Sequence, residues 1–216
     1  MIKGIIFDFD GLLVDTEIIS YYIYRDILKE YGHSFSIDEY ASDYSGKSEI
    51  TNMSNLIETY SLPFDLNKGL KIEADTEEKH FSMGVNLKKG VKELLDYLKE
   101  HRYKTTIATS STKDRCLNIL KSHGIEGYFD AFVFTNEVKH GKPDPDIFLE
   151  ASNRLNIMQE ECLVLEDSEA GIEAAFRAKI PVICIPDMKM PDPSFAYKTS
   201  AVLDDLNQVI IYLEEQ

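Results

Sequence analysis

The sequence predicts an α/β fold: a doubly wound, Rossmann-like parallel sheet core with an inserted α-helical cap domain. The first observation is a set of short, almost continuously apolar or β-branched runs, which are typical of parallel strands buried on both faces. These runs occupy residues 3–8, 104–109, 131–134, 162–166 and 181–185. The second observation is that helical patterns alternate with these runs from residue 90 onwards, at residues 91–101, 115–123 and 147–155. Such alternation predicts a doubly wound parallel sheet.

A region from about residue 18 to 83 breaks the alternation and predicts a second domain. It shows no convincing strand pattern, and we expect helices at residues 18–31, 37–44, 49–60 and 66–81. Because a structureless insert of this length is uncommon inside a compact domain, we expect a small helical cap inserted after the first strand. The expected division is a core domain of residues 1–17 and 84–216 and a cap domain of residues 18–83.

The charge balance narrows the partners that the chain can bind. Its 216 residues carry a formal net charge of −15, which repels nucleic acid and anionic membrane surfaces. We therefore expect neither as a partner, and an anionic substrate needs local positive charge from a metal ion, a lysine or helix N-termini. The three cysteines lack a C-x-x-C pattern, and no signal-peptide or membrane-spanning pattern is present. We expect a cytoplasmic protein that is a monomer or a weak dimer.

Two carboxylates arrive together at the end of the first expected strand, in Asp8-Phe9-Asp10-Gly11. Alternate side chains of a strand share a face, so Asp8 and Asp10 would point into one pocket, and Gly11 permits a sharp turn. Two adjacent aspartates repel each other unless a cation or a shared proton relieves the repulsion. This pair suits a metal-assisted enzyme in which one carboxylate attacks and the other transfers a proton. The alternative is a capped strand end followed by a turn.

Three further strand ends carry polar groups that suit phosphoryl transfer. Ser110 and Ser111 precede a helix, where hydroxyl and backbone N–H groups bind phosphate oxygens, although a serine there is often only a helix cap. Lys142 lies in a proline-rich turn and is either aimed at the site or solvated. Glu166 and Asp167 would complete an all-oxygen site of the kind that Mg²⁺ prefers, or they cap the next helix. Four such strand ends in one chain make coincidence a poor explanation.

At these positions the chain resembles the haloacid dehalogenase superfamily, and within it the β-phosphoglucomutase-like phosphatases. The four signatures in order are Asp8-Phe9-Asp10-Gly11, Ser110 after an apolar run, Lys142 in Gly-Lys-Pro-Asp-Pro-Asp, and Glu166-Asp167-Ser168 with Gly171. The resemblance covers the whole chain, including the helical cap. It implies that Mg²⁺ is the cofactor. The implied metal ligands are Asp8, the backbone carbonyl of Asp10 and Asp167, with Glu166 in support.

The resemblance also implies the catalytic roles. Asp8 is the expected nucleophile that forms an aspartyl-phosphate, and Asp10 is the expected general acid and then base. Ser110 and Lys142 are expected to hold the phosphoryl oxygens. Further candidate substrate-binding residues are Gly11, Thr16, Ser20, Gly46, Lys47 and Ser111. Lys47 is interpreted as a cap residue that leans over the site, with a solvated lysine as the alternative.

The second aspartate separates the branches of the superfamily. Dehalogenases and phosphonatases are expected to lack Asp10, so its presence favours phosphate esters, and we expect hydrolysis of a small phosphomonoester such as a sugar phosphate. The alternative is a β-phosphoglucomutase, which is expected to carry a histidine where this chain has Ser20 and an arginine where it has Glu49. A non-catalytic sensor of phosphorylated metabolites is a distant alternative, because none of the motif residues is lost.

Overall fold

The computed structural model describes residues 1–215, and the chain separates into two compact units. The first, called the core unit, comprises Met1–Asp15 and the chain from Leu87 onward. The second, called the insert unit, is Thr16–Asn86. Among residues 1–215, no helix combines the length and the apolar character needed to cross a membrane.

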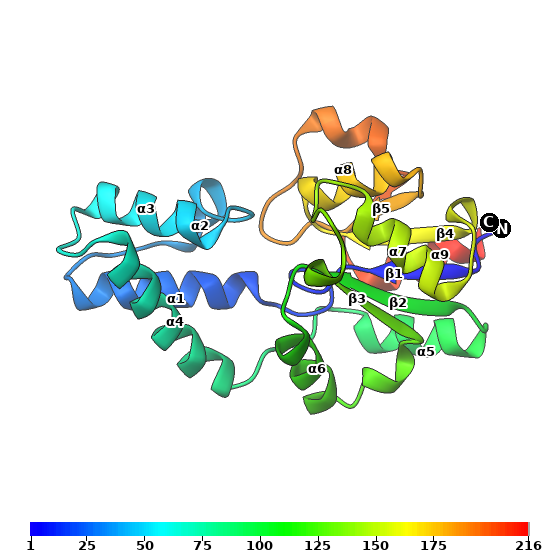
Figure 1. Cartoon of the computed structure of the whole chain (residues 1–216), viewed down its shortest axis with the longest axis horizontal. Helices are drawn as coiled ribbons and strands as arrows, with labels where there is room; N and C mark the ends of the chain where they lie inside the picture. The colour runs from blue at the N-terminus through cyan, green and yellow to red at the C-terminus, as the bar shows by residue number, and fades with distance from the viewer. Residues whose placement is uncertain (216) are drawn as a thin grey trace. The chain divides into compact units, whose positions relative to one another are not determined.

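A parallel sheet forms the centre of the core unit, with the strand order β3-β2-β1-β4-β5-β6 (Figure 1). The strands are β1 (Gly4–Phe7), β2 (Lys104–Thr109), β3 (Ala131–Phe134), β4 (Cys162–Glu166), β5 (Val182–Cys184) and β6 (Ala201–Val202). Phe7 at the end of β1 pairs with Ile107 in β2 and with Leu165 in β4. This register aligns the carboxyl ends of the three central strands, so the residues that follow them emerge at one edge. The predicted α/β fold class is confirmed.

Helices cover both faces of the sheet. They are α5 (Val91–Glu100), α6 (Lys113–Ser122), α7 (Asp146–Leu155), α8 (Glu169–Ala178) and α9 (Leu206–Glu214), with short 3-10 turns at Glu126–Tyr128, Thr135–Glu137, Gln159–Glu161 and Pro193–Lys198. Right-handed crossovers that run from β1 towards β3 place α5 and α6 on one face, and those that run towards β6 place α7 and α8 on the other (Figure 1).

The core between the sheet and the α7–α8 layer is apolar and closely packed. Ile6 and Val164 from the central strands meet Phe148 on α7 and Ala174 and Ala175 on α8, and all five are fully buried. The small side chains of α8 let this helix approach the sheet closely. Since helix α8 starts immediately after the acidic end of β4, this packing also fixes the position of the residues at that end.

The insert unit is helical, with α1 (Glu17–Glu30), α2 (Ile37–Asp43), α3 (Glu49–Tyr60) and α4 (Leu66–Ser82). Three of these helices begin at side-chain caps: Ser36, Ser48 and Asp65 each accept a hydrogen bond from a backbone N–H in the first turn. Helices α1 and α4 pack against each other. Aromatic rings fill much of the interior, as Phe35 contacts the rings of Tyr21, Tyr40, Tyr44 and Tyr60.

Two elements were not expected from the sequence. Strand β6 has only two residues and extends the sheet by pairing Ile183 with Ala201. Helix α9 packs against α5 and buries Leu206, Val209 and Leu213. The strands at residues 104–109, 131–134 and 162–166 lie where the apolar runs predict them.

Candidate active site

The site begins at Asp8, the first residue after β1. Its backbone N–H still donates to the carbonyl of Leu165 at 3.0 Å, so the edge of the sheet holds it in place. Only 7% of the residue is exposed. The Lys142 ammonium donates to Asp8 Oδ1 and, at 2.6 Å, to Glu166 Oε1. One buried lysine therefore joins the ends of β1 and β4.

Glu166 ends β4 and is completely buried. Its Oε2 accepts hydrogen bonds from the backbone N–H groups of Asp167 at 2.9 Å and Ser168 at 2.8 Å, and from the Ser168 hydroxyl at 2.9 Å. The other carboxylate oxygen, Oε1, accepts a hydrogen bond from the Lys142 ammonium. Both oxygens are therefore occupied by protein donors, which compensates for the burial of the charge. A Cβ at Gly171 would overlap the Glu166 carboxylate, so only glycine fits there.

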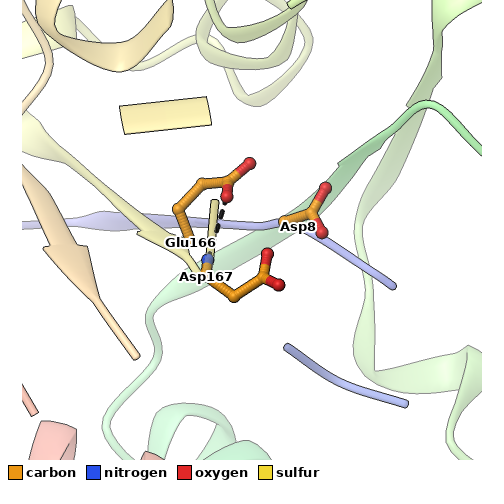
Figure 2. A group of neighbouring side chains, drawn as sticks. All are labelled: Asp8, Glu166 and Asp167. Carbon is orange, nitrogen blue, oxygen red and sulfur yellow. Dashed lines mark hydrogen bonds between the residues drawn. The ribbon is translucent and has the colours of Figure 1, made fainter. Parts of the chain in front are cut away.

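Three carboxylates form a candidate metal site in this part of the core unit. Oxygens from Asp8, Glu166 and Asp167 lie within 4.8 Å of one another. In Figure 2 the carboxylates of Asp8 and Asp167 converge, and Glu166 turns one oxygen back to the Asp167 backbone. An all-carboxylate donor set of this kind suits a hard divalent cation such as Mg²⁺. Because Glu166 is engaged by protein donors, the arrangement fits Asp8 and Asp167 as direct ligands and Glu166 as their support.

Electrostatics support a cation at this position. Burial raises the pKa of Asp8 to about 7, and the charges of Glu166 and Asp10 add to the increase, while Lys142 opposes it. Burial also raises the pKa of Asp167, with Glu166 and Asp8 as the next causes. For Lys142, burial opposes the charged form, but the two carboxylates outweigh it and raise the pKa. The negative charge here exceeds what one lysine neutralises, and a divalent cation held by these carboxylates would neutralise the remainder.

Asp10 is not one of the three carboxylates of this group. Its Oδ2 accepts a hydrogen bond from the Ser111 hydroxyl at 2.6 Å, and its Oδ1 accepts from Arg115 Nη2 at 3.0 Å. Ser111 is itself fixed because its backbone N–H donates to Thr109 Oγ1 at 2.9 Å. Asp8 and Asp10 therefore have different partners, although the sequence pattern places them together.

The remaining predicted residues of the core unit are Ser110 and Gly11. Ser110 follows β2 and is exposed, and its hydroxyl lies 3.5 Å from Thr135 Oγ1. Gly11 has a φ of +80°, and a Cβ there would lie 2.9 Å from the Asp167 Cγ. A side chain at position 11 would thus displace a candidate metal ligand. The substrate-binding roles of both residues stay predictions.

Four predicted substrate-binding residues belong to the insert unit. Thr16 precedes α1 and is buried, and its carbonyl accepts a hydrogen bond from the Ser20 hydroxyl at 3.4 Å. Gly46 has a φ of +74° and is exposed. The Lys47 ammonium donates to the carbonyl of Asp43 at 2.5 Å within the same unit. Their roles towards a substrate stay predictions.

Two residues near the site were not identified from the sequence. Arg115 lies in the first turn of α6, where a positive charge is unfavourable for the helix dipole, and this position was a weak signal of an anionic partner. Asp187 follows β5 and accepts from Lys88, and its charge contributes to the raised pKa of Asp167. Its Oδ2 lies 3.4 Å from the point that a Gly11 Cβ would occupy. Asp187 could have been noticed because it follows the fifth apolar run.

Comparison with known proteins identifies the class of protein that this fold and site define. Residues 5–185 match the sequence pattern of the haloacid dehalogenase-like hydrolase family, and the chain belongs to that family. The expected superfamily and its β-phosphoglucomutase-like branch are confirmed.

Individual relatives carry names from this branch. The chain is 35% identical over 178 residues to a phosphorylated carbohydrates phosphatase of Thermotoga maritima, and the matched region covers 82% of each protein. It is 29% identical over 184 residues to a fructose-1-phosphate phosphatase of Escherichia coli, covering 83% of this chain and 94% of that one. Among solved structures, a suggested beta-phosphoglucomutase from Thermotoga maritima is similar with a TM-score of 0.84 and 31% identity, covering 99% of both chains.

Proposed function

We propose that this protein is a Mg²⁺-dependent phosphatase that hydrolyses a small phosphomonoester, such as a sugar phosphate, through an aspartyl-phosphate on Asp8. The observation that carries the proposal is the buried Lys142, which joins Asp8 to Glu166 beside the Asp167 carboxylate. This arrangement supports the proposal because the proposed nucleophile, a lysine cation and a candidate metal site lie together at one edge of the sheet. The expectation of a phosphoric monoester hydrolase is confirmed by the family and by the phosphatase relatives.

The first half of the proposed reaction transfers the phosphoryl group to the protein. An Asp8 carboxylate oxygen attacks phosphorus, the bond from phosphorus to the ester oxygen breaks, and Asp10 gives its proton to that oxygen so that an alcohol leaves. Lys142 neutralises charge on the phosphoryl oxygens, which matters because such transition states gain mainly from positioning and charge neutralisation. A Mg²⁺ ion held by Asp8 and Asp167 would supply further positive charge to neutralise the transferring phosphoryl group.

The second half returns Asp8 to its starting state. Asp10, now a carboxylate, takes a proton from water, and the water oxygen attacks phosphorus. The bond between phosphorus and the Asp8 oxygen breaks, so inorganic phosphate leaves and Asp10 is protonated again. Asp10 thus acts as a general acid in the first half of the reaction and as a general base in the second half.

A sugar phosphomutase of the β-phosphoglucomutase type is the second candidate. It is favoured by the similarity in fold and sequence to the suggested beta-phosphoglucomutase of Thermotoga maritima. Against it, Ser20 and Glu49 occupy the positions where the mutase pattern expects a histidine and an arginine. A non-catalytic sensor is disfavoured because Asp8, Lys142 and Glu166 are assembled with the contacts that catalysis needs.

The first test is metal dependence. We expect release of phosphate from p-nitrophenyl phosphate with Mg²⁺ and its loss after treatment with EDTA, because the repulsion among the carboxylates is then uncompensated. Turnover should return when Mg²⁺ is added back. Activity that survives complete metal removal would contradict the assignment of the carboxylate cluster.

The second test is the nucleophile. Asp8→Asn should reduce turnover by at least about 10³-fold, because an amide does not attack phosphorus. Asp114→Asn removes an exposed carboxylate from α6 and is the matched control, with turnover unchanged. Mass spectrometry of the wild-type protein after a rapid quench should detect the added phosphoryl mass on the peptide that contains Asp8. A label on any other aspartate would exclude the proposed intermediate.

A further inference from the structure

The ion pair between Arg115 and Asp10 has no role in the proposed reaction steps. Arg115 lies in the first turn of α6, and its Nη2 donates to Asp10 Oδ1 at 3.0 Å. Both side chains are about one-third exposed, at 30% and 33%. Exposed pairs of this kind contribute little to stability. Stability is therefore a weak reason for a long cationic side chain to contact this particular carboxylate.

The local structure aims Arg115 at Asp10. Helix α6 starts directly after the Ser110-Ser111 segment, and its cap Thr112 accepts a hydrogen bond from the Arg115 backbone N–H at 3.4 Å. A cation in the first helical turn opposes the helix dipole unless an anion compensates it. The Asp10 carboxylate supplies that anion. Ser111 reaches the second oxygen from the same segment, so the start of α6 holds both oxygens of Asp10.

We propose that Arg115 is a positioning residue that fixes Asp10 Oδ1 and thereby reserves Oδ2 as the oxygen that carries the proton. This inference rests on the proposed phosphatase reaction, in which Asp10 acts as acid and base. A guanidinium group only donates hydrogen bonds. Oδ1 must therefore accept from Arg115 whether Asp10 is ionised or protonated, and the proton belongs on the other oxygen.

The Ser111 hydroxyl is suited to that other oxygen because it both donates and accepts. When Asp10 is ionised, Ser111 donates to Oδ2, as the structure shows. When Asp10 is protonated, the hydrogen on Oδ2 is directed either to Ser111 Oγ or to the ester oxygen of the substrate. The proton then moves from Oδ2 to the leaving oxygen as the ester bond breaks, and Arg115 keeps the carboxyl plane fixed throughout.

The test compares two leaving groups. Arg115→Gln removes the charge and the forked donor, and we expect about a 10- to 100-fold loss of kcat on fructose 1-phosphate, whose alcohol must be protonated as it leaves. On p-nitrophenyl phosphate, whose phenolate leaves without a proton, the loss should stay below about 3-fold. Arg115→Lys should recover part of the activity on fructose 1-phosphate. Lys113→Gln, which removes an exposed cation from the same helical turn, is the matched control and should match the wild type.

A double substitution separates positioning from a merely structural role. If Arg115 acts through Asp10, then Asp10→Asn with Arg115→Gln should be no slower on fructose 1-phosphate than Asp10→Asn alone. The proposal would be overturned if the rate losses of the two single substitutions multiplied in the double variant. It would also be overturned if Arg115→Gln lost equal activity on both substrates. Calorimetric Mg²⁺ affinity and the unfolding midpoint should be unchanged in Arg115→Gln, and a loss of either would assign Arg115 a structural role instead. A wild-type protein inactive on both esters would remove the proposed function itself, a result distinct from these.

Discussion

At the scale of single residues, the acidic end of β4 depends on a glycine that contributes no side chain. Gly171 lies within α8, where a glycine normally destabilises a helix by up to about 1 kcal/mol relative to alanine. Here the missing Cβ leaves room for the Glu166 carboxylate, which a methyl group would overlap. The glycine is thus explained by the site and not by the helix.

We expect Gly171→Ala to destabilise the protein despite the gain in helix propensity. We expect a loss of about 1–3 kcal/mol in the free energy of unfolding, because the methyl group forces Glu166 away from its donors. Urea unfolding measures the loss. The matched control is Gly127→Ala, where a Cβ would meet no atom within 4 Å. A Gly171→Ala protein as stable as the parent would show that Glu166 moves at no cost.

Single residues also show what sequence reasoning can and cannot anticipate. The structure brings Asp8, Lys142 and Glu166 together, as expected for residues at or after the carboxyl ends of parallel strands, and their catalytic roles stay predictions. Arg115 and Asp187 were missed because their relation to the site depends on how a long side chain or a loop is directed in space. One-dimensional spacing does not encode either direction, although the position of Arg115 in a first helical turn was a usable signal.

At the scale of elements, a buried pair links α1 to α4 in the insert unit. The Tyr24 hydroxyl donates to Glu73 Oε1 at 2.7 Å, and both residues are buried. Burial raises the pKa of Glu73 to about 7; the Tyr24 hydrogen bond opposes this shift, and the charges of Glu49 and Glu77 add to it. Folding of this unit is therefore linked to a proton on Glu73.

The sign of the pH dependence follows from this shift. The unfolded chain releases the Glu73 proton near its ordinary pKa of 4.5, while the folded unit keeps it up to about pH 7. The stabilisation is thus complete below about pH 4.5 and is lost as the pH rises through 7. The full decrease in the free energy of unfolding is roughly 3 kcal/mol. In unfolding experiments between pH 5 and 8, Glu73→Gln should lose this part of the pH dependence.

The control for this prediction is Glu78→Gln, which changes an exposed carboxyl group on the same helix. It should keep the pH dependence of the parent protein. If the free energy of unfolding changes equally between pH 5 and 8 in Glu73→Gln and in the parent protein, Glu73 is not the group whose proton stabilises the unit.

Elements with strong patterns were predicted well, and weak ones were not. The helix over Glu49–Tyr60 lies at the residues that its pattern predicts. Strand β6 has two residues, too few for any periodicity, and its place at the sheet edge is set by pairing with β5. Helix α9 did carry a signal, because Leu206, Val209 and Leu213 repeat at helical spacing and are buried.

At the scale of the whole molecule, an acidic protein binds an anionic substrate only through local cations. The net charge is −15, yet Lys142 and Arg115 lie at the edge of the sheet where the strand ends meet. The fold produces a local concentration of positive charge in a negatively charged protein, because it brings distant strand ends together. The fold class could be predicted from the alternation of strands and helices, but the substrate could not, because its recognition depends on side-chain positions that the patterns do not specify.

We expect the identity of residues in the insert unit to distinguish hydrolysis from phosphoryl transfer within a sugar. A mutase must keep its phospho-enzyme away from water until the sugar has turned over, which requires tight recognition of the sugar. In this chain Ser20 bonds to its own helix through the Thr16 carbonyl, and Glu49 adds a negative charge at the start of α3. Neither side chain offers the cationic donor that an anionic sugar phosphate needs.

We therefore expect β-glucose 1-phosphate, if it is turned over, to give inorganic phosphate and not glucose 6-phosphate, even with a bisphosphate activator present. Phosphorus NMR follows both products in one sample, so their initial rates compare water with the sugar hydroxyl as acceptors of the same phosphoryl group. Ser20→His with Glu49→Arg provides the converse, because restoring both cationic donors should raise the share of glucose 6-phosphate. Glucose 6-phosphate forming faster than free phosphate in the wild-type protein would show that the insert unit excludes water without those two side chains, and the mutase would then be the correct assignment.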